Sequence, residues 1–396
     1  MTCPHCERAA AYHQDRGRCV VSILGALHFR RAYYYCRRCS QGYAPFDQQA
    51  GFTTRQLSPA CERLATLAGG TCESFERGAD TLEEMAGIRL SEATVERTTE
   101  DVGARLAQLY EHEQTVGPPV QWPWHRDAAG LQVAYVTIDA TGTRQQGPGG
   151  RAAEGRMAYV AGVYNPVPDD GVLPPQPRPL RMQARYVAGL YDLEEMGPLL
   201  RRQAGRVGMQ AAEVWVALTD GGNGLEEFCR QNFARPDLVV ILDFYHAASY
   251  LEKLAQALFP HDEDQAAGQA EQWCRLLKAE GGAATLAVLE NAEWPARQSA
   301  TLKEQLETTR GYFTNNVQRM EYPEYQAQGW QIGSGVVESA CKTVVGQRLK
   351  GAGMRWSEAG AHALCQVRAL YRSEKGQWDA FWQRQFTNRP PVQQQR

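Results

Sequence analysis

The sequence lacks long hydrophobic runs, an export signal and a strong net charge of either sign. No stretch of about 18 or more consecutive apolar residues occurs, so we expect no transmembrane helix and no membrane partner. The opening residues, M-T-C-P-H-C, contain no apolar signal segment, so we expect a cytoplasmic protein. The formal net charge of −3 neither favours nor excludes nucleic acid as a partner, because a near-neutral total can hide local patches of one sign.

The sequence contains 11 cysteines, an odd number that disfavours a framework in which every cysteine forms a disulfide. The absence of an export signal disfavours such a framework further. Four of the cysteines form two C-x-x-C pairs, Cys3 with Cys6 and Cys36 with Cys39. Each pair can present two thiolates from a tight turn, and two pairs complete a tetrahedral Zn²⁺ site. Because Cys19–Leu24 and His28–Tyr35 both favour strands, we expect residues 1–45 to form a zinc ribbon.

The expected ribbon has a basic rim. The arginines of this rim are Arg30, Arg31, Arg37 and Arg38. A rim of this kind suits contacts with phosphate groups, although a solvated charged face would have the same composition.

We expect residues 46–125 to form a helical region with a possible helix-turn-helix. Helices are favoured over Gln56–Gly69 and Thr81–Leu109, the second of which is interrupted at Gly87 and capped again near Ser91. This interruption resembles a helix-turn-helix, but two helices that simply pack together give the same pattern. The acidic residues after Ser91 disfavour DNA contact; they are Glu92, Glu96, Glu100 and Asp101. The proline-containing segment Val116–Gly130 is expected to be a linker.

The stretch V-A-Y-V-T-I-D (133–139) predicts a strand that is buried on both faces and ends on Asp139. Burying that carboxylate requires a partner. After a Gly-rich loop (145–155), further strands are expected at 156–165, 180–188, 213–219 and 238–242, with a proline-rich loop at 166–179 and a helix at 192–206. This order of elements is that of the ribonuclease H fold. In that fold the first strand lies beside the fourth, so Asp139 and Asp220 would meet.

We therefore expect an α/β protein in which residues 126–250 form the first part of a ribonuclease H-like domain. Residues 251–325 lack alternating apolar runs and predict a helical insertion, and residues 326–396 complete the domain. Glu338 is expected in the first turn of a helix after a Gly-Ser-Gly loop. Four basic residues near it suit a phosphodiester backbone; they are Lys342, Arg348, Lys350 and Arg355.

Asp139, Asp220 and Glu338 form a candidate metal site. Three carboxylates about 4 Å apart would repel by roughly 4 kcal/mol per pair at an effective dielectric constant near 20. Two Mg²⁺ ions about 3.5–4 Å apart would remove that repulsion and activate the attacking and leaving oxygens. A turn cap is the competing interpretation for Asp220, and a favourable charge at a helix start is the competing one for Glu338.

Five blocks carry a family resemblance: Y-V-T-I-D-A-T-G (135–142), L-T-D-G-G-N-G (218–224), D-F-Y-H (243–246), G-S-G-V-V-E-S-A-C-K (333–342) and R-L-K-G-A-G-M-R-W-S (348–357). Together with the cysteine pairs, they resemble bacterial insertion-sequence transposases of the DDE class, in the Kra-type branch related to the Mutator-like group. The resemblance covers nearly the whole chain. It implies that Asp139, Asp220 and Glu338 are the catalytic triad. Asp243 and His246 match an Asp/Cys-x-x-His motif near the site, which leaves Asp243 as an alternative second acid.

The expected function is therefore a DNA transposase that uses Mg²⁺ or Mn²⁺, cuts at element ends and joins them to target DNA. We expect it to act as a homo-oligomer on DNA, associated with the nucleoid. His246 would contact the scissile phosphate, orient a ligand, or serve as an ordinary core histidine. The alternatives are a nuclease of the same fold without strand transfer and a transposase-derived DNA-binding protein without catalysis.

Overall fold

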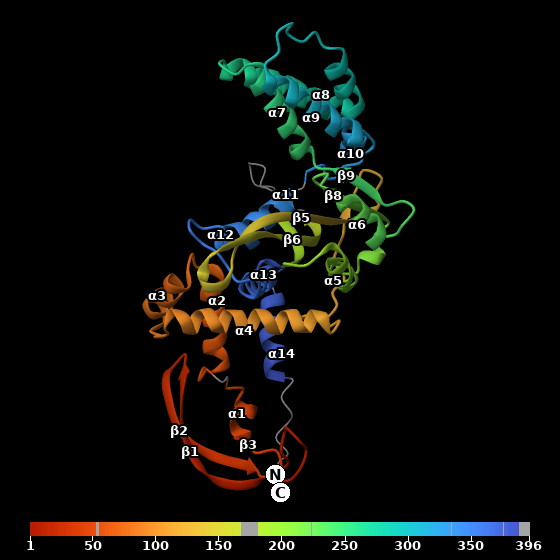
Figure 1. The fold of residues 1–396 in the computed structure, drawn as a ribbon. Coiled ribbons are helices and arrows are strands. Elements are labelled where there is room, and N and C mark those ends of the chain that lie inside the picture. Colours follow the sequence, from red (N-terminus) through yellow and green to blue (C-terminus); the bar gives the residue numbers. More distant parts are fainter. Residues whose placement is uncertain (53–54, 168–180, 223, 334, 375, 388–396) are drawn as a thin grey trace.

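The computed structural model describes residues 1–52, 55–167, 181–222, 224–333, 335–374 and 376–387 (Figure 1). The N-terminal ribbon and a group of long helices lie at opposite ends, with a helical layer and a central sheet between them (Figure 1). The predicted proline-rich loop falls almost entirely outside the described residues. No helix among those residues is both long and apolar enough to cross a membrane.

The N-terminal module is a three-stranded antiparallel sheet. Its strands are β1 (Ala11–Ser22), β2 (Gly25–Cys36) and β3 (Gln41–Tyr43). The short helix α1 (Pro45–Ala50) packs against β1 and β2, where Asp47 forms ion pairs with Arg18 and Arg31. Strand β1 begins eight residues before the predicted Cys19 and ends two before Leu24, whereas β2 begins three residues before the predicted His28 and ends one after Tyr35. The two strands pair along their whole length as a ribbon.

Three helices form the layer between the ribbon and the central sheet. They are α2 (Pro59–Thr71), α3 (Phe75–Ala86) and α4 (Glu92–Glu111), and each begins at a serine whose side chain accepts a hydrogen bond from the first turn. The apolar face of α4 packs on α13 (Glu358–Arg372). At this crossing a Cβ on Gly103 would lie 2.2 Å from the carbonyl oxygen of Ala363, so only glycine allows the close approach.

The central sheet has the strand order β7-β6-β5-β8-β9. Its strands are β5 (Gln132–Gln146), β6 (Ala152–Val167), β7 (Arg181–Gly189), β8 (Val214–Thr219) and β9 (Val239–Leu242). The first three pair antiparallel, whereas β8 and β9 run parallel to β5. The first strand of the sheet therefore lies beside the fourth, as the order of elements in the sequence predicted.

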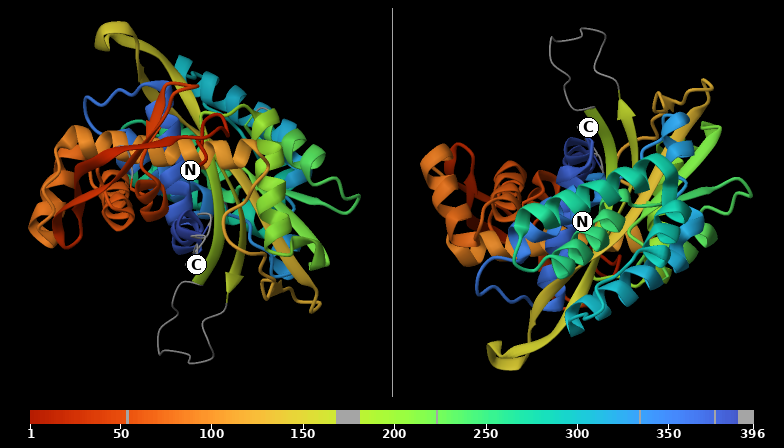
Figure 2. Two further views of the ribbon diagram at one scale, coloured as in Figure 1. Left: turned by 90° about the horizontal axis from the view of Figure 1, so that it is seen from below. Right: turned by 90° about the horizontal axis from the view of Figure 1, so that it is seen from above.

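Strand β5 does not end at Asp139, and this part of the prediction was wrong. It continues to Gln146 and pairs with β6 as a two-stranded arm that projects beyond the rest of the sheet (Figure 2). The turn lies instead in η1 (Pro148–Gly150), where Gly149 and Gly150 have φ values of 67° and 74°. Along the arm, Thr143 and Gln145 are buried whereas Arg144 and Gln146 are exposed, as in a strand whose successive side chains point to opposite faces.

Residues 116–130 are not the free linker that was expected. Trp122 and Trp124 are 2% and 4% exposed and belong to the core on one face of the sheet. The indole of Trp122 donates to Glu374, and that of Trp124 donates to the carbonyl of Gly208. The short strand β4 (His125–Arg126) then pairs with β5.

Helices cover both faces of the sheet. One face carries α5 (Leu193–Arg206), α6 (Leu225–Asn232), α13 and α14 (Gln377–Thr387), together with η2 (Met209–Ala211). The other carries α7 (Phe244–Leu258), α8 (Glu263–Asn291), α9 (Ala300–Asn316), η3 (Val317–Arg319) and α10 (Tyr322–Ala327). The regular elements from 244 to 327 are all helical, as the sequence predicted. The chain between α10 and α13 forms α11 (Gly335–Ala340), the π-helical turn η4 (Cys341–Gly346) and α12 (Gln347–Leu349).

Candidate functional site

Three aspartates lie at one level of the central sheet. In the parallel pair of β5 and β8, position 137 is opposite 218, so the same register places Asp139 beside Asp220. In the pair of β8 and β9, position 219 is opposite 242, which places Asp243 beside Asp220. Neighbouring strands are about 4.8 Å apart. The register therefore brings all three acids together on adjacent strands.

Glu338 completes an acidic cluster from outside the sheet. It lies in the first turn of α11, as predicted, and its carboxylate is exposed. It interacts electrostatically with Asp139 and contacts the side chain of Asp243. The sequence-predicted triad thus converges on one place, with Asp243 as a fourth member.

The surroundings of Asp139 favour its neutral form. Burial raises the pKa of its carboxyl, and the negative charges of Asp220 and Glu338 raise it further. The N–H of Ala140 donates to the carboxylate at 2.6 Å and opposes this shift. The thiol of Cys341 also faces Asp139, and burial next to that carboxylate raises the pKa of the thiol well above its usual range.

Asp243 is the most deeply buried of the four acids, with 0% of its surface exposed. Its side chain caps α7 by accepting hydrogen bonds from the N–H groups of Tyr245 and His246. Burial raises the pKa of Asp243 to about 7, and the nearby Glu338 contributes to the shift. The side chain therefore has a structural role in capping α7, whereas Asp220 is half-buried and Glu338 is exposed.

Asp220 borders a cavity of about 780 Å³ between α6, α7 and α9. The N–H of Gly222 donates to its carboxylate at 2.8 Å, so the turn-cap interaction considered from the sequence is present. The hydroxyl of Tyr312 donates to its backbone carbonyl at 3.0 Å. The half-buried His246 lines the same cavity and places its ring against Tyr312.

The acids are spaced more widely than the ligands of a single metal ion. In the described part of the chain, only the four ribbon cysteines form a group of three or more His, Cys, Asp or Glu side chains whose ligand atoms all lie within 4.8 Å of one another. No described lysine or arginine forms an ion pair with Asp139, Asp220 or Glu338. The repulsion within the cluster is thus left without a compensating cation from those residues.

Three of the four predicted DNA-binding cations are exposed. Lys342, Lys350 and Arg355 point to solvent, and Lys350 donates to the hydroxyl of Thr141 in the β5–β6 arm. The prediction for Arg348 was wrong, because this residue is 1% exposed. It donates to the carbonyl of Gly69 and lies against the rings of Phe75 and Trp356, where it joins the helical layer to the rest of the protein.

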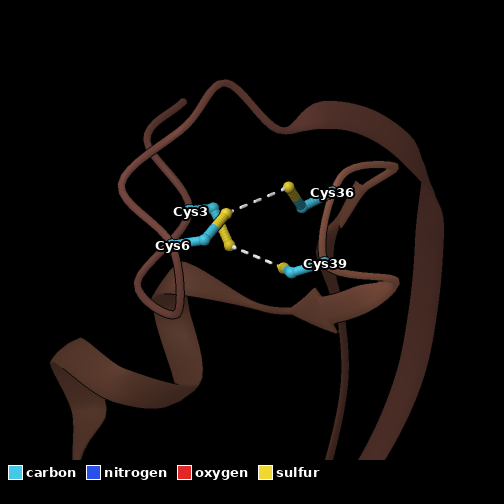
Figure 3. Close-up of side chains that lie close together, drawn as sticks. All are labelled: Cys3, Cys6, Cys36 and Cys39. Atoms are coloured by element: carbon cyan, nitrogen blue, oxygen red, sulfur yellow. Dashed lines mark hydrogen bonds between the residues drawn. The ribbon is translucent and has the colours of Figure 1, made fainter.

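The four predicted zinc ligands meet at the base of the N-terminal ribbon (Figure 3). The sulfurs of Cys3 and Cys39 are 3.6 Å apart, as are those of Cys6 and Cys36. The residue after each pair, Glu7 and Ser40, has a positive φ of 57° or 56°, so the two knuckles share one backbone conformation. This arrangement can hold a metal ion such as Zn²⁺.

The backbone and the neighbouring thiols shift the pKa values of two of these cysteines in opposite directions. The N–H of Cys39 lowers the pKa of Cys36 to about 7, which favours the thiolate that a metal requires. Burial, together with the thiols of Cys3 and Cys6, raises the pKa of Cys39 to about 12. A bound cation would relieve this crowding of sulfur atoms.

Two parts of the acidic site were missed from the sequence. Cys341 follows Glu338 by three residues, a spacing that places both side chains on one helical face, so its position beside the acids could have been inferred. The contribution of Tyr312 had no local signal, because 92 residues separate it from Asp220.

No protein-family model matches the sequence, and a search of curated proteins finds no match.

Proposed function

We propose that this protein is a metal-dependent DNA transposase of the DDE class, with a ribonuclease H-like catalytic domain. The observation that carries the proposal is the sheet register that places Asp139 beside Asp220 on adjacent parallel strands, with Glu338 facing them from α11. The reaction would cut DNA at the ends of an insertion sequence and join the freed 3′ hydroxyl to target DNA.

The donor atoms of this site fit Mg²⁺ or Mn²⁺. All are carboxylate oxygens, which these ions prefer together with water and phosphate oxygens. The ligands of a two-ion site lie farther apart than those of a single ion, which agrees with the wide spacing of the carboxylates here. Asp139, Asp220 and Glu338 would hold the metal, which when bound activates the attacking oxygen and stabilises the leaving one.

The protein itself would position the DNA. Lys342 follows Glu338 by four residues and Lys350 reaches Thr141, two residues after Asp139, whereas Arg355 precedes Trp356, which pairs with Gln145 in the β5–β6 arm. All three are exposed and would contact backbone phosphates. The bond from Lys350 to Thr141 holds this lysine against the β5–β6 arm. His246 lies in the cavity beside Asp220, where its ring would contact the scissile phosphate or orient a ligand.

A strand-transfer assay tests this proposal. The protein is incubated with Mg²⁺, a target plasmid and pre-cut duplexes made from DNA flanking its coding region. We expect covalent joining of the duplex to the plasmid through its 3′ end. Cleavage of uncut ends without joined product would assign a nuclease instead, and DNA binding without either reaction in Mg²⁺ or Mn²⁺ would assign a non-catalytic binding protein.

A further inference from the structure

The positive charge of this protein is concentrated at its N-terminus. Residues 1–44 contain seven arginines and no lysine, against only Glu7 and Asp15, which gives a net charge of +5. Since the whole chain carries −3, residues 45–396 carry −8. A basic module on an acidic protein is the electrostatic footprint of a nucleic-acid-binding surface.

The β1–β2 ribbon has one covered face and one open face. Side chains opposite each other in an antiparallel pair share a face, and the faces alternate along each strand. Arg18 and Phe29 form one such pair, and both contact α1 or the residues after it, through Asp47 and Phe52. Their face is therefore already occupied within the protein.

The open face is formed by the alternating pairs, Gly17 with Arg30 and Cys19 with His28. A shallow hollow of about 470 Å³ is lined by these four residues together with Arg18 and Phe29. Arg30 and His28 are exposed, and within the described part of the chain the Arg30 guanidinium donates only to the backbone carbonyl of Asp15. The open face thus combines a depression with available positive charge.

The knuckle that follows β2 adds two more arginines. Arg37 and Arg38 are exposed and form no ion pair with a described residue, in contrast to Arg18 and Arg31, which both pair with Asp47. Together with Arg30, they give the ribbon three exposed guanidinium groups that can contact phosphates.

We propose that the open face of the β1–β2 ribbon binds duplex DNA, with Arg30, Arg37 and Arg38 on the phosphate backbone. A two-stranded ribbon fits the major groove, which is about 12 Å wide. Twelve-residue strands span about 40 Å, which is close to one turn of the double helix. This inference rests on the proposed function, because it takes DNA as the substrate.

The ribbon lies apart from the acidic cluster. The helices α2, α3 and α4 lie between the ribbon and the central sheet that carries the acids (Figure 1). The ribbon would therefore hold a part of the duplex away from the scissile phosphate. It also takes the role that the sequence suggested for α4, whose exposed acidic residues include Glu92 and Asp101.

The test compares full-length variants by fluorescence anisotropy with a labelled mixed-sequence duplex of about 40 bp. Replacing Arg30, Arg37 and Arg38 together by alanine should weaken binding and reduce the slope of log affinity against log salt by about 3, about 1 per lost contact. The same positions changed to lysine should restore most of the slope. A matched control replaces three exposed arginines of α3, α4 and the turn between them, Arg77, Arg89 and Arg97, and should leave the slope within about 1 of the wild-type value.

Gly17→Glu tests the face itself. A side chain at Gly17 meets no atom within 4 Å, so the change should preserve the fold and zinc content while placing a negative charge on the open face. We expect weaker duplex binding from this single change, whereas Gly17→Ala should bind as the wild type does.

Equal binding and equal salt slopes for the wild type and the triple alanine variant would overturn the ribbon proposal. If the wild-type protein nevertheless carried out strand transfer, the proposed function would stand. Tighter binding of single-stranded RNA than of the duplex, lost in the triple variant, would also overturn the assignment to duplex DNA. A wild-type protein that binds no DNA at low salt would remove both proposals.

Discussion

The cysteine cluster allows a sharp prediction, in which Cys36→Ser removes one of four thiolates. The module around the cluster has a small core of its own, formed by Cys3, Ala10, Cys36 and Tyr43. Of these, only Tyr43 is large, and burying such a side chain contributes about 1.5–3 kcal/mol. A structural zinc ion contributes about 10–16 kcal/mol of apparent binding free energy in small zinc modules. We therefore expect the variant to lose its zinc and the N-terminal ribbon to unfold.

The assay combines elemental analysis with limited trypsin digestion of anaerobically purified protein. The wild type should contain about one zinc ion per chain and resist cleavage at Arg30 and Arg37. The Cys36→Ser protein should contain almost none and lose the ribbon rapidly, while the core around the central sheet survives. Cys19→Ser is the matched control, because Cys19 lies in the same ribbon beside His28 but outside the cluster. Wild-type protein without zinc, or a Cys36→Ser protein that retains it, would refute the reasoning.

Three further predictions concern packing, pH and the second acid. Gly103→Ala should lower the free energy of unfolding by about 1–3 kcal/mol in chemical denaturation, because its Cβ would meet the backbone of Ala363; an unchanged midpoint would contradict this packing. In metal-free protein, Asp243 has a raised pKa of about 7, so its contribution to stability should be greatest below the usual carboxyl pKa of about 3.9 and should be lost as the pH rises through 7. A thermal melting series in which the Asp243→Asn variant shows the same dependence of melting temperature on pH as the wild type would count against this. Asp243→Asn should retain some strand transfer in Mn²⁺, whereas Asp220→Asn should retain none; the reverse result would make Asp243 the second catalytic acid.

The individual strands could be predicted because local patterns define them, whereas the pairing of β5 with β8, and with it the acidic cluster, was inferred from the order of elements along the chain. Along β5, Ala134 and Val136 join the core on one face, while Val133 and Tyr135 join the core on the other. This two-sided burial produces the continuous apolar run from which the strand was predicted. The C-x-x-C spacing likewise defines each knuckle locally, and the pairing of β1 with β2 brings the two knuckles together.

The errors arose where distant parts of the chain meet. Arg348 has the sequence context of an exposed cation, but it is buried because Phe75 and Trp356, from separate segments, enclose its guanidinium. Trp122 was placed in a linker because the prolines around it suggest a loop, whereas its indole is held by Glu374, 252 residues away. The arm beyond Asp139 depends on pairing with β6, which periodicity alone does not reveal.

The central claim is that Asp139, Asp220 and Glu338 act together as metal ligands in DNA cleavage and joining. The most direct measurement is strand transfer and DNA binding by Asp139→Asn, Asp220→Asn and Glu338→Gln, changes that nearly preserve shape and remove one negative charge each. Each variant should lose cleavage and joining in Mg²⁺ but bind DNA at least as tightly as the wild type, because phosphate contacts come from lysine and arginine. Full activity in any one of the three would contradict the claim.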